Sequence, residues 1–196
     1  RTAAVVLPLF LFVTFLAVAG VAFVGAVSAY AFYSRDLPFA TDLEKIAFNQ
    51  QSVIYDRTGT VELARFGDQR RETVTFDEIP PVLLDATTAV EDRSFWTNTG
   101  FDPVGIASAA LATLQGDPRG GSTITQQLVR QRLLDDALVQ DPARTVERKI
   151  KEIIQSVRVT QAYPGLEGKQ RIITAYLNQN FYGNNDYGIK AAAKDY

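Results

Sequence analysis

The stretch GGSTITQQLVRQRLL, residues 120–134, is typical of a glycine-containing turn that leads into an amphipathic helix. Thr123 and Gln126 have the spacing of a capping box, which predicts that the helix begins at Ser122 or Thr123. Apolar residues recur along one side of this helix, and we expect them to face a core: Ile124, Leu128 and Leu134.

The polar side of the same helix carries Thr123, Gln127 and Arg130 at positions i, i+4 and i+7. The glycines before it allow a ligand to approach the backbone, and the free N–H groups of a helix N-terminus attract anions. Two interpretations stay open at this point. The polar side either holds a phosphate or is a solvated face of a capped helix.

Helical patterns continue on both sides of this stretch. Pro81 fits the first position of a helix that runs to Glu91, and Asp102 with Pro103 caps a helix that carries VGIASAALATL. The run GDPRGG, residues 116–121, breaks that helix. Further helices are predicted from Asp141-Pro142 to about Thr160, after Gly168 through IITAYLN, and over YGIKAAAKDY near the end of the chain.

One small β element interrupts this pattern. Residues 52–66, SVIYDRTGTVELARF, alternate between apolar and polar side chains on either side of a turn at Gly59, which predicts a β-hairpin. The predicted fold class is therefore mainly α.

The first part of the chain has no charged side chain from Thr2 to Ser34. A bilayer core needs about 20 apolar residues of helix, so residues 1–34 are predicted to form one transmembrane helix. A cleaved signal peptide has an apolar core of only about 7 to 15 residues, and a buried core helix rarely stays uncharged for so long. The aromatic cluster of Tyr30, Phe32 and Tyr33 marks the expected boundary of the membrane. Arg1 alone on the other flank does not determine the orientation.

The composition excludes several classes of chemistry. The 196 residues include no Cys and no His, which rules out disulfides, thiol nucleophiles, Cys/His zinc sites and Ser-His-Asp triads. The net charge of -2 does not indicate nucleic-acid binding. Catalysis by this chain must use carboxylates, hydroxyls, amides, Lys or Arg.

Two charged segments are candidates for such chemistry. In the first, Glu91 and Asp92 adjoin Arg93 and two aromatic residues, so that one acid can have a raised pKa in a dry environment while the other pairs with Arg93. An ordinary charged helix end is the alternative. In the second, RTVERKIKE at residues 144–152, Arg148 and Glu152 are four residues apart and are expected to meet. Periodicity alone favours a solvated salt bridge worth a few tenths of a kcal/mol.

These segments occur in an order that resembles the family 51 glycosyltransferases, the peptidoglycan polymerases of class A penicillin-binding proteins and monofunctional transglycosylases. The resemblance covers Val53 to Tyr196 and rests on EDRSFWTNTGFD, GGSTITQQLVRQ, RKIKE, and AYLNQNFYG with AAAKDY. It implies a lysozyme-like helical lobe and a smaller membrane-associated jaw lobe. The expected organisation is a transmembrane helix (1–34), a connector (35–51) and a glycosyltransferase domain (52–196) that is truncated at its C-terminus.

The resemblance also implies the function and the site. The chain would polymerise lipid II into β-1,4 glycan strands with inversion, releasing undecaprenyl diphosphate on the outer face of a bacterial plasma membrane, in contact with the cell-wall synthesis machinery and without nucleic acid. Glu91 would be the base, and the antibiotic moenomycin would inhibit the reaction. The second catalytic position is Glu152, and the substrate and diphosphate residues are Asp92, Ser122, Thr123, Gln127, Arg130, Arg148, Lys149 and Asn178. A divalent cation, Mg²⁺ or Mn²⁺, is compatible with this set.

The chemistry suits these residues, because a diphosphate leaves as a stable anion and needs cations more than a general acid. Two alternatives stay open: a membrane-anchored lysozyme-like lytic enzyme and a catalytically weak cell-wall interaction module. Asn98 stands where the family usually has His, and Gln131 where it usually has Asn. We expect both differences to alter local packing rather than remove activity. No Ser-x-x-Lys motif occurs, so the chain holds no penicillin-binding active site.

Overall fold

The computed structural model describes residues 3–45, 48, 51–67, 69–117 and 120–196. The chain divides into two compact units, Arg1–Leu37 and Pro38–Tyr196, which are considered separately. Arg1, parts of the predicted connector, and residues 118–119 of the GDPRGG run lie outside the described residues.

The first unit is helix α1, Ala3–Tyr33. Its segment Leu9–Tyr33 has a mean hydropathy of 2.5 and is long and apolar enough to cross a membrane. At about 1.5 Å per residue, 25 helical residues span roughly 37 Å, which exceeds the roughly 30 Å of a bilayer core. Large apolar side chains such as Phe10 and Phe23 are exposed around it. Such a surface fits lipid better than water, as predicted from the sequence.

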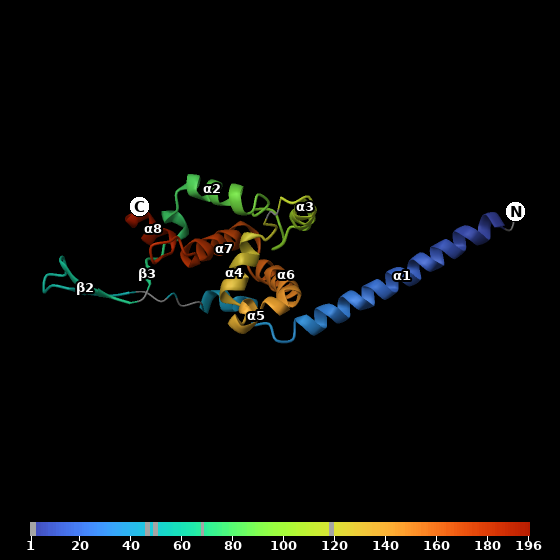
Figure 1. Ribbon diagram of the computed structural model, residues 1–196, viewed down its shortest axis with the longest axis horizontal. Coiled ribbons are helices and arrows are strands. Elements are labelled where there is room, and N and C mark those ends of the chain that lie inside the picture. Colours follow the sequence, from blue (N-terminus) through green and yellow to red (C-terminus); the bar gives the residue numbers. More distant parts are fainter. Residues whose placement is uncertain (1–2, 46–47, 49–50, 68, 118–119) are drawn as a thin grey trace. The chain divides into compact units, whose positions relative to one another are not determined.

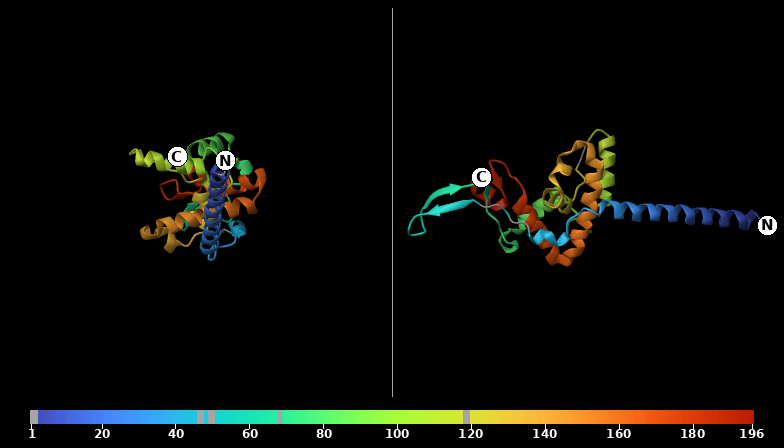
Figure 2. Two further views of the ribbon diagram at one scale, coloured as in Figure 1. Left: turned by 90° about the vertical axis from the view of Figure 1, so that its right-hand side faces the viewer. Right: turned by 90° about the horizontal axis from the view of Figure 1, so that it is seen from below.

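The second unit is built mainly of α-helices (Figures 1 and 2). Among the described residues helices far outnumber strands, which confirms the predicted mainly α class. The α-helices are α2 (Pro81–Glu91), α3 (Pro103–Leu114), α4 (Ile124–Arg132), α5 (Asp136–Gln140), α6 (Thr145–Ala162), α7 (Gly165–Gln179) and α8 (Ile189–Asp195). Short 3-10 helices are η1 (Ala40–Lys45), η2 (Phe76–Glu78) and η3 (Pro142–Arg144).

Helix α4 lies at the centre of the core. It packs against α6 and α7, and Figure 1 shows it between them. Apolar side chains from all three helices are fully or almost fully buried there: Ile124, Leu128, Val129, Val159, Ile172, Ile173 and Leu177. Burial on two sides explains why the polar side of α4 has little room and must point to a few defined partners.

The caps of these helices follow the sequence closely. Thr123 is the N-cap of α4, and its hydroxyl accepts a hydrogen bond from Gln126 N while Gln126 closes the capping box. Asp102 caps α3 by accepting from Gly105 N, with Pro103 in the first turn. The long helix predicted from Asp141-Pro142 begins with η3 and continues as α6.

One predicted helix start is wrong. Helix α7 begins at Gly165, so Gly168 lies in its first turn and does not precede it. A Cβ atom at Gly168 would lie 1.9 Å from the carbonyl oxygen of Tyr163. The glycine is needed because the chain turns back tightly between α6 and α7.

The strands form two small pairs. Strands β1 (Ser52–Tyr55) and β2 (Glu62–Phe66) are antiparallel and form the predicted hairpin, with Gly59 at a φ of 74° in the turn. The hairpin extends from the helices in Figure 2. Strands β3 (Arg70–Arg71) and β4 (Asp186–Tyr187) form a short parallel pair that the sequence did not predict.

Candidate active site

Glu91 is the last residue of α2 and its side chain is exposed. Its carboxylate accepts a hydrogen bond from Gln127 Nε2 on α4, which lies 2.8 Å from Glu91 Oε2. Both Glu91 and Ser122 line a cavity of about 500 Å³, whose other lining residues are 90, 92–93, 102, 105, 108–109, 120–121 and 123. A solvent-accessible carboxylate is thus held at the edge of a cavity large enough for part of a sugar substrate.

Asp92 has a different environment from its neighbour Glu91. It is 6% exposed, and its carboxylate accepts hydrogen bonds from Ser94 Oγ, from Asn98 Nδ2 and from Ile124 N at the start of α4. An anion is favoured at this helix end. The predicted pairing of an acid with Arg93 is wrong: within the described part of the chain Arg93 makes no ion pair with Glu91 or Asp92, and its Nε donates to the carbonyl oxygen of Ala89.

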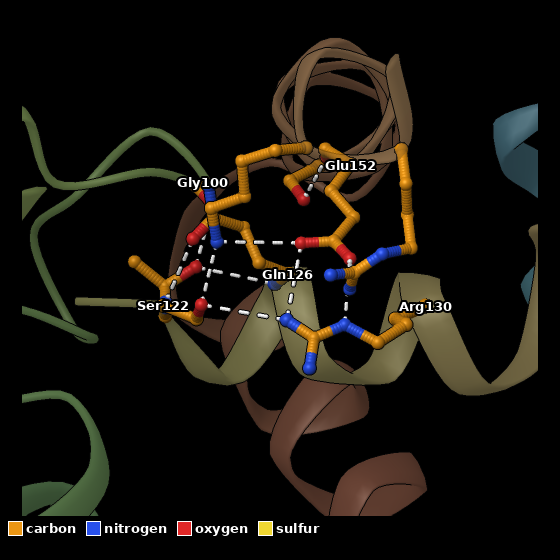
Figure 3. Close-up of polar contacts among 9 residues, drawn as sticks. Gly100, Ser122, Gln126, Arg130 and Glu152 are labelled. Atoms are coloured by element: carbon orange, nitrogen blue, oxygen red, sulfur yellow. Dashed lines mark hydrogen bonds and ion pairs between the residues drawn. The ribbon is translucent and has the colours of Figure 1, made fainter. Parts of the chain in front are cut away.

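Glu152 forms the centre of a cluster of cations between α4 and α6 (Figure 3). Its side chain has no exposed surface. Arg130 Nε lies 2.6 Å from Glu152 Oε1 and Arg130 Nη2 lies 3.1 Å from Oε2, so this pair is bidentate. Arg148 Nη1 is 2.7 Å from Oε1, and Lys149 Nζ is 3.3 Å from Oε2. The interpretation of Arg148 and Glu152 as a solvated pair is therefore wrong, since α4 covers the carboxylate.

The cluster has a net charge of two positive units, since three cations surround one carboxylate. Burial opposes the charge on Glu152, but the hydrogen bond and charge of Arg130, with Lys149 and Arg148, hold the pKa of Glu152 below its usual value. Burial lowers the pKa of Lys149, and the charge of Glu152 acts in the opposite direction. The surplus positive charge makes the cluster suited to an anionic ligand.

Ser122 connects this cluster to the cavity. Its hydroxyl oxygen lies 2.5 Å from Lys149 Nζ and 3.4 Å from Arg130 Nη2, and the same residue lines the cavity with Glu91. Figure 3 shows Ser122 on the segment that enters α4, with the side chains of Arg130 and Glu152 pointing toward each other between the helices. An anion bound at Ser122 would therefore lie beside two of the three cations.

Two predicted site residues have their side chains engaged in the fold. Thr123 is 2% exposed, and its hydroxyl donates to the carbonyl oxygen of Gly100 at 2.7 Å. Asn178 is 4% exposed, and its amide bonds both N and O of Val74. Asn178 lines another cavity, together with Leu43, Phe48, Tyr163 and further residues of that region. The structure thus brings together the predicted residues except Asn178.

The structure adds contacts that the sequence did not predict. Tyr176 O–H donates to Gln127 Oε1 at 3.2 Å, which orients the amide that contacts Glu91. Gln131, one of the two differences from the family pattern, donates to Asn180 Oδ1 at 3.3 Å. Gly100 has a φ of 103°, and a Cβ there would lie 2.3 Å from the carbonyl oxygen of Ser156. In the sequence, this close approach is indicated only by the glycine itself, at the end of the segment EDRSFWTNTG.

No group of three or more Cys, His, Asp or Glu side chains that could hold a metal ion occurs among the described residues.

A mainly helical unit that holds an exposed carboxylate at a cavity, with Ser122 connecting that cavity to a cluster of cations, has the groups expected of an enzyme active site. A comparison with models of protein families identifies the family of this chain. The model described as Transglycosylase matches residues 59–196, so the chain belongs to the transglycosylase family. The resemblance to the family 51 glycosyltransferases is thereby confirmed.

Curated relatives agree with this assignment. The chain is 39% identical to penicillin-binding protein 1A of Escherichia coli (strain K12) over 177 residues, which cover 88% of this chain and 20% of the relative. It is 37% identical to penicillin-binding protein 1A of Aquifex aeolicus (strain VF5) over 164 residues, or 83% and 21% of the two chains. It is 35% identical to penicillin-binding protein 1A/1B of Bacillus subtilis (strain 168) over 175 residues, or 88% and 18%. The chain spans about a fifth of the length of these relatives.

Proposed function

We propose that this chain is a peptidoglycan glycosyltransferase that polymerises lipid II into β-1,4 glycan strands with inversion. Membership of the transglycosylase family and the names of the relatives support a glycosyltransferase of cell-wall synthesis. The observation that carries the finer proposal is that an exposed carboxylate, Glu91, lines the same cavity as Ser122, which contacts two of the clustered cations.

Glu91 acts as the general base. Gln127 donates to Oε2 of Glu91, and we assign the acceptor's proton to Oε1. As Glu91 takes the proton from the 4-hydroxyl of the acceptor N-acetylglucosamine, O4 attacks C1 of the N-acetylmuramoyl group on the donor. The C1–O bond to the diphosphate breaks, and its electron pair leaves with undecaprenyl diphosphate. Attack opposite to the leaving group inverts C1 from α to β.

The cation cluster stabilises the leaving group. The diphosphate that links donor and lipid carries two negative charges, which match the two surplus positive charges around Glu152. Arg130 and Lys149 already contact Ser122, which lines the cavity. In this proposal Glu152 does not exchange a proton with substrate. It holds the three cations at fixed positions.

Helix α1 supports this proposal, because it is long and apolar enough to anchor the protein in the membrane, where a substrate with a polyprenyl chain stays. We propose that the second unit lies on the outer face. Protease added to intact spheroplasts should then digest the part of the chain that follows Arg35. Full protection until the cells are lysed would reverse this topology.

The direct test is an assay of the protein in detergent with purified lipid II. We expect polymeric glycan, and we expect moenomycin to suppress it. A lytic enzyme would instead leave lipid II unchanged and shorten preformed glycan. An interaction module would do neither, and its cellular function would survive the Glu91→Gln substitution.

A further inference from the structure

Lys169 on α7 is a buried lysine close to the candidate site. Lys169 is only 5% exposed, and its Nζ donates a hydrogen bond to Asn98 Oδ1 at 3.0 Å. The same ammonium lies 4.8 Å from the centre of the Phe95 ring. Burial lowers the pKa of Lys169, and the charge of Asp92 acts in the opposite direction. A buried cation is costly, so its retention needs a specific partner.

Lys169 determines which way the amide of Asn98 faces. An ammonium only donates hydrogen bonds, and it therefore requires the amide oxygen on its side. Gly100 N also donates to this oxygen, at 3.0 Å. The amide nitrogen of Asn98 consequently faces Asp92, where it lies 3.1 Å from Oδ1 and 3.0 Å from Oδ2.

Asp92 connects the Lys169–Asn98 contact to Glu91, the proposed base. Its Oδ2 accepts from Ile124 N, the first residue of α4, at 3.2 Å. Asp92 follows Glu91 directly, and Gln127 on α4 contacts the Glu91 carboxylate. The end of α2 and the start of α4 are thus joined through Asp92, whose orientation depends on Asn98.

We infer that Lys169 is a positioning residue for Glu91, acting through Asn98 and Asp92 to hold the base against α4. Only the expected effect on kcat rests on the proposed function. Among the described residues, Lys169 does not line the cavity and is not one of the cations that pair with Glu152. Its loss should therefore slow the chemical step without weakening substrate binding.

The experiment compares Lys169→Met with Lys190→Met, a matched control in which an exposed lysine paired with Glu78 is changed in the same way. We expect Lys169→Met to lower kcat for lipid II about tenfold or more with KM within twofold, because a displacement of about 1 Å can cost up to 10² in rate. The control should change neither. Equal kcat in both variants would overturn the inference, as would a rise in KM with kcat unchanged.

A second variant covers the case in which Lys169→Met does not fold. Asn98→Asp keeps the size of the side chain and an acceptor for Lys169, but it cannot donate to Asp92. We expect it to lower kcat in the same way. Where both single variants fold, the double variant should lose no more than the worse of the two, since both break one connection. Additive losses would mean that the two residues act independently.

Hydrogen exchange separates failure of this inference from failure of the proposed function. The Ile124 amide should exchange faster in Lys169→Met or Asn98→Asp than in the unchanged protein, while the Leu128 amide, inside α4, should not. If the unchanged protein makes no glycan, the proposed function is wrong, and this exchange pattern still decides the positioning role. Unchanged exchange at Ile124 would reject that role even in an active enzyme.

Discussion

Glu91 and Glu152 are two glutamates of the candidate site whose surroundings differ strongly. Glu91 is exposed at the end of α2 and receives a hydrogen bond from the neutral amide of Gln127. Glu152 is fully buried in α6, and three cations contact its carboxylate. A carboxylate whose oxygens are all engaged by cations holds its surroundings in place, whereas one with a single neutral donor remains able to take a proton from a substrate.

This contrast assigns different consequences to the same substitution. Replacing Glu with Gln keeps the shape of the side chain and removes its charge. At Glu91 the substitution should remove activity and spare the fold, and at Glu152 it should affect the fold first.

Glu91→Gln should give the largest effect. Loss of a general base costs about 10² to 10⁴ in rate, and the amide cannot accept the acceptor's proton. We expect this loss in lipid II turnover, with the melting temperature within a few degrees of that of the unchanged protein. Glu167→Gln, an exposed glutamate on α7, is the matched control and should be fully active. Retention of near-normal turnover by Glu91→Gln would remove the base from the mechanism.

Glu152→Gln should act on stability. Removing one partner of a buried ion pair costs about 3 to 5 kcal/mol, and we expect the lower end because the three cations are partly exposed. Urea denaturation of the detergent-solubilised protein measures the loss. Glu147→Gln on the same helix is the control, since Glu147 pairs with Arg144 and Lys151 at the surface and should cost less than about 1 kcal/mol. Equal losses in the two variants would contradict the distinction between them.

Arg130→Ala should lower turnover by a smaller factor than Glu91→Gln. A hydrogen bond from a cation to a charged group contributes about 1.5 to 3 kcal/mol, which corresponds to roughly 10- to 150-fold in turnover or moenomycin affinity. Part of the effect will be lost stability, because Arg130 also neutralises Glu152. Arg130→Lys keeps the charge without the bidentate contact and should lie in between. Arg144→Ala, which removes a surface cation of α6's N-terminal end, should leave turnover unchanged.

The smallest effect is expected from acid. The pKa of Glu152 is lowered in the folded protein, so the folded state binds the proton less readily than the unfolded chain does. The ionised carboxylate of Glu152 contributes fully to the stability of the fold above its unfolded pKa of about 4.3. This contribution is lost as the pH falls through the lower pKa that Glu152 has in the folded protein. Between about pH 5 and pH 3 the melting temperature of the unchanged protein should therefore fall more steeply than that of Glu152→Gln. Glu78 and Glu147, each with a pKa lowered to about 2, are present in both proteins and cancel. Parallel curves would show that Glu152 is not the group that titrates.

Features set by local sequence were predictable. The capping box at Thr123, the proline-started helices α2 and α3, the hairpin around Gly59 and the uncharged run of α1 each depend on residues within a few positions of one another. The family motifs indicated which charged residues to consider for the site.

Features set by packing between distant segments were not predictable in the same way. The burial of Glu152 depends on Arg130, 22 positions away, and spacing along α6 alone suggested a solvated pair. The contact between Lys169 and Asn98 joins residues 71 positions apart. The sequence predicted that the helix begins after Gly168, whereas the close approach of Gly168 to Tyr163 becomes apparent only when α6 and α7 are placed side by side.

Gly100 should tolerate substitution poorly, although it takes no part in the chemistry. It carries no functional group, yet any side chain there would meet the carbonyl oxygen of Ser156 at 2.3 Å with the backbone in a left-handed conformation. Its own carbonyl oxygen accepts a hydrogen bond from the hydroxyl of Thr123, the N-cap of α4. In a saturation screen for cell-wall synthesis, Gly100 should be as intolerant as Glu91. Such a screen would record both as essential, and only the amount of folded protein would distinguish Glu91, the proposed base, from Gly100, which leaves room for the backbone of Ser156.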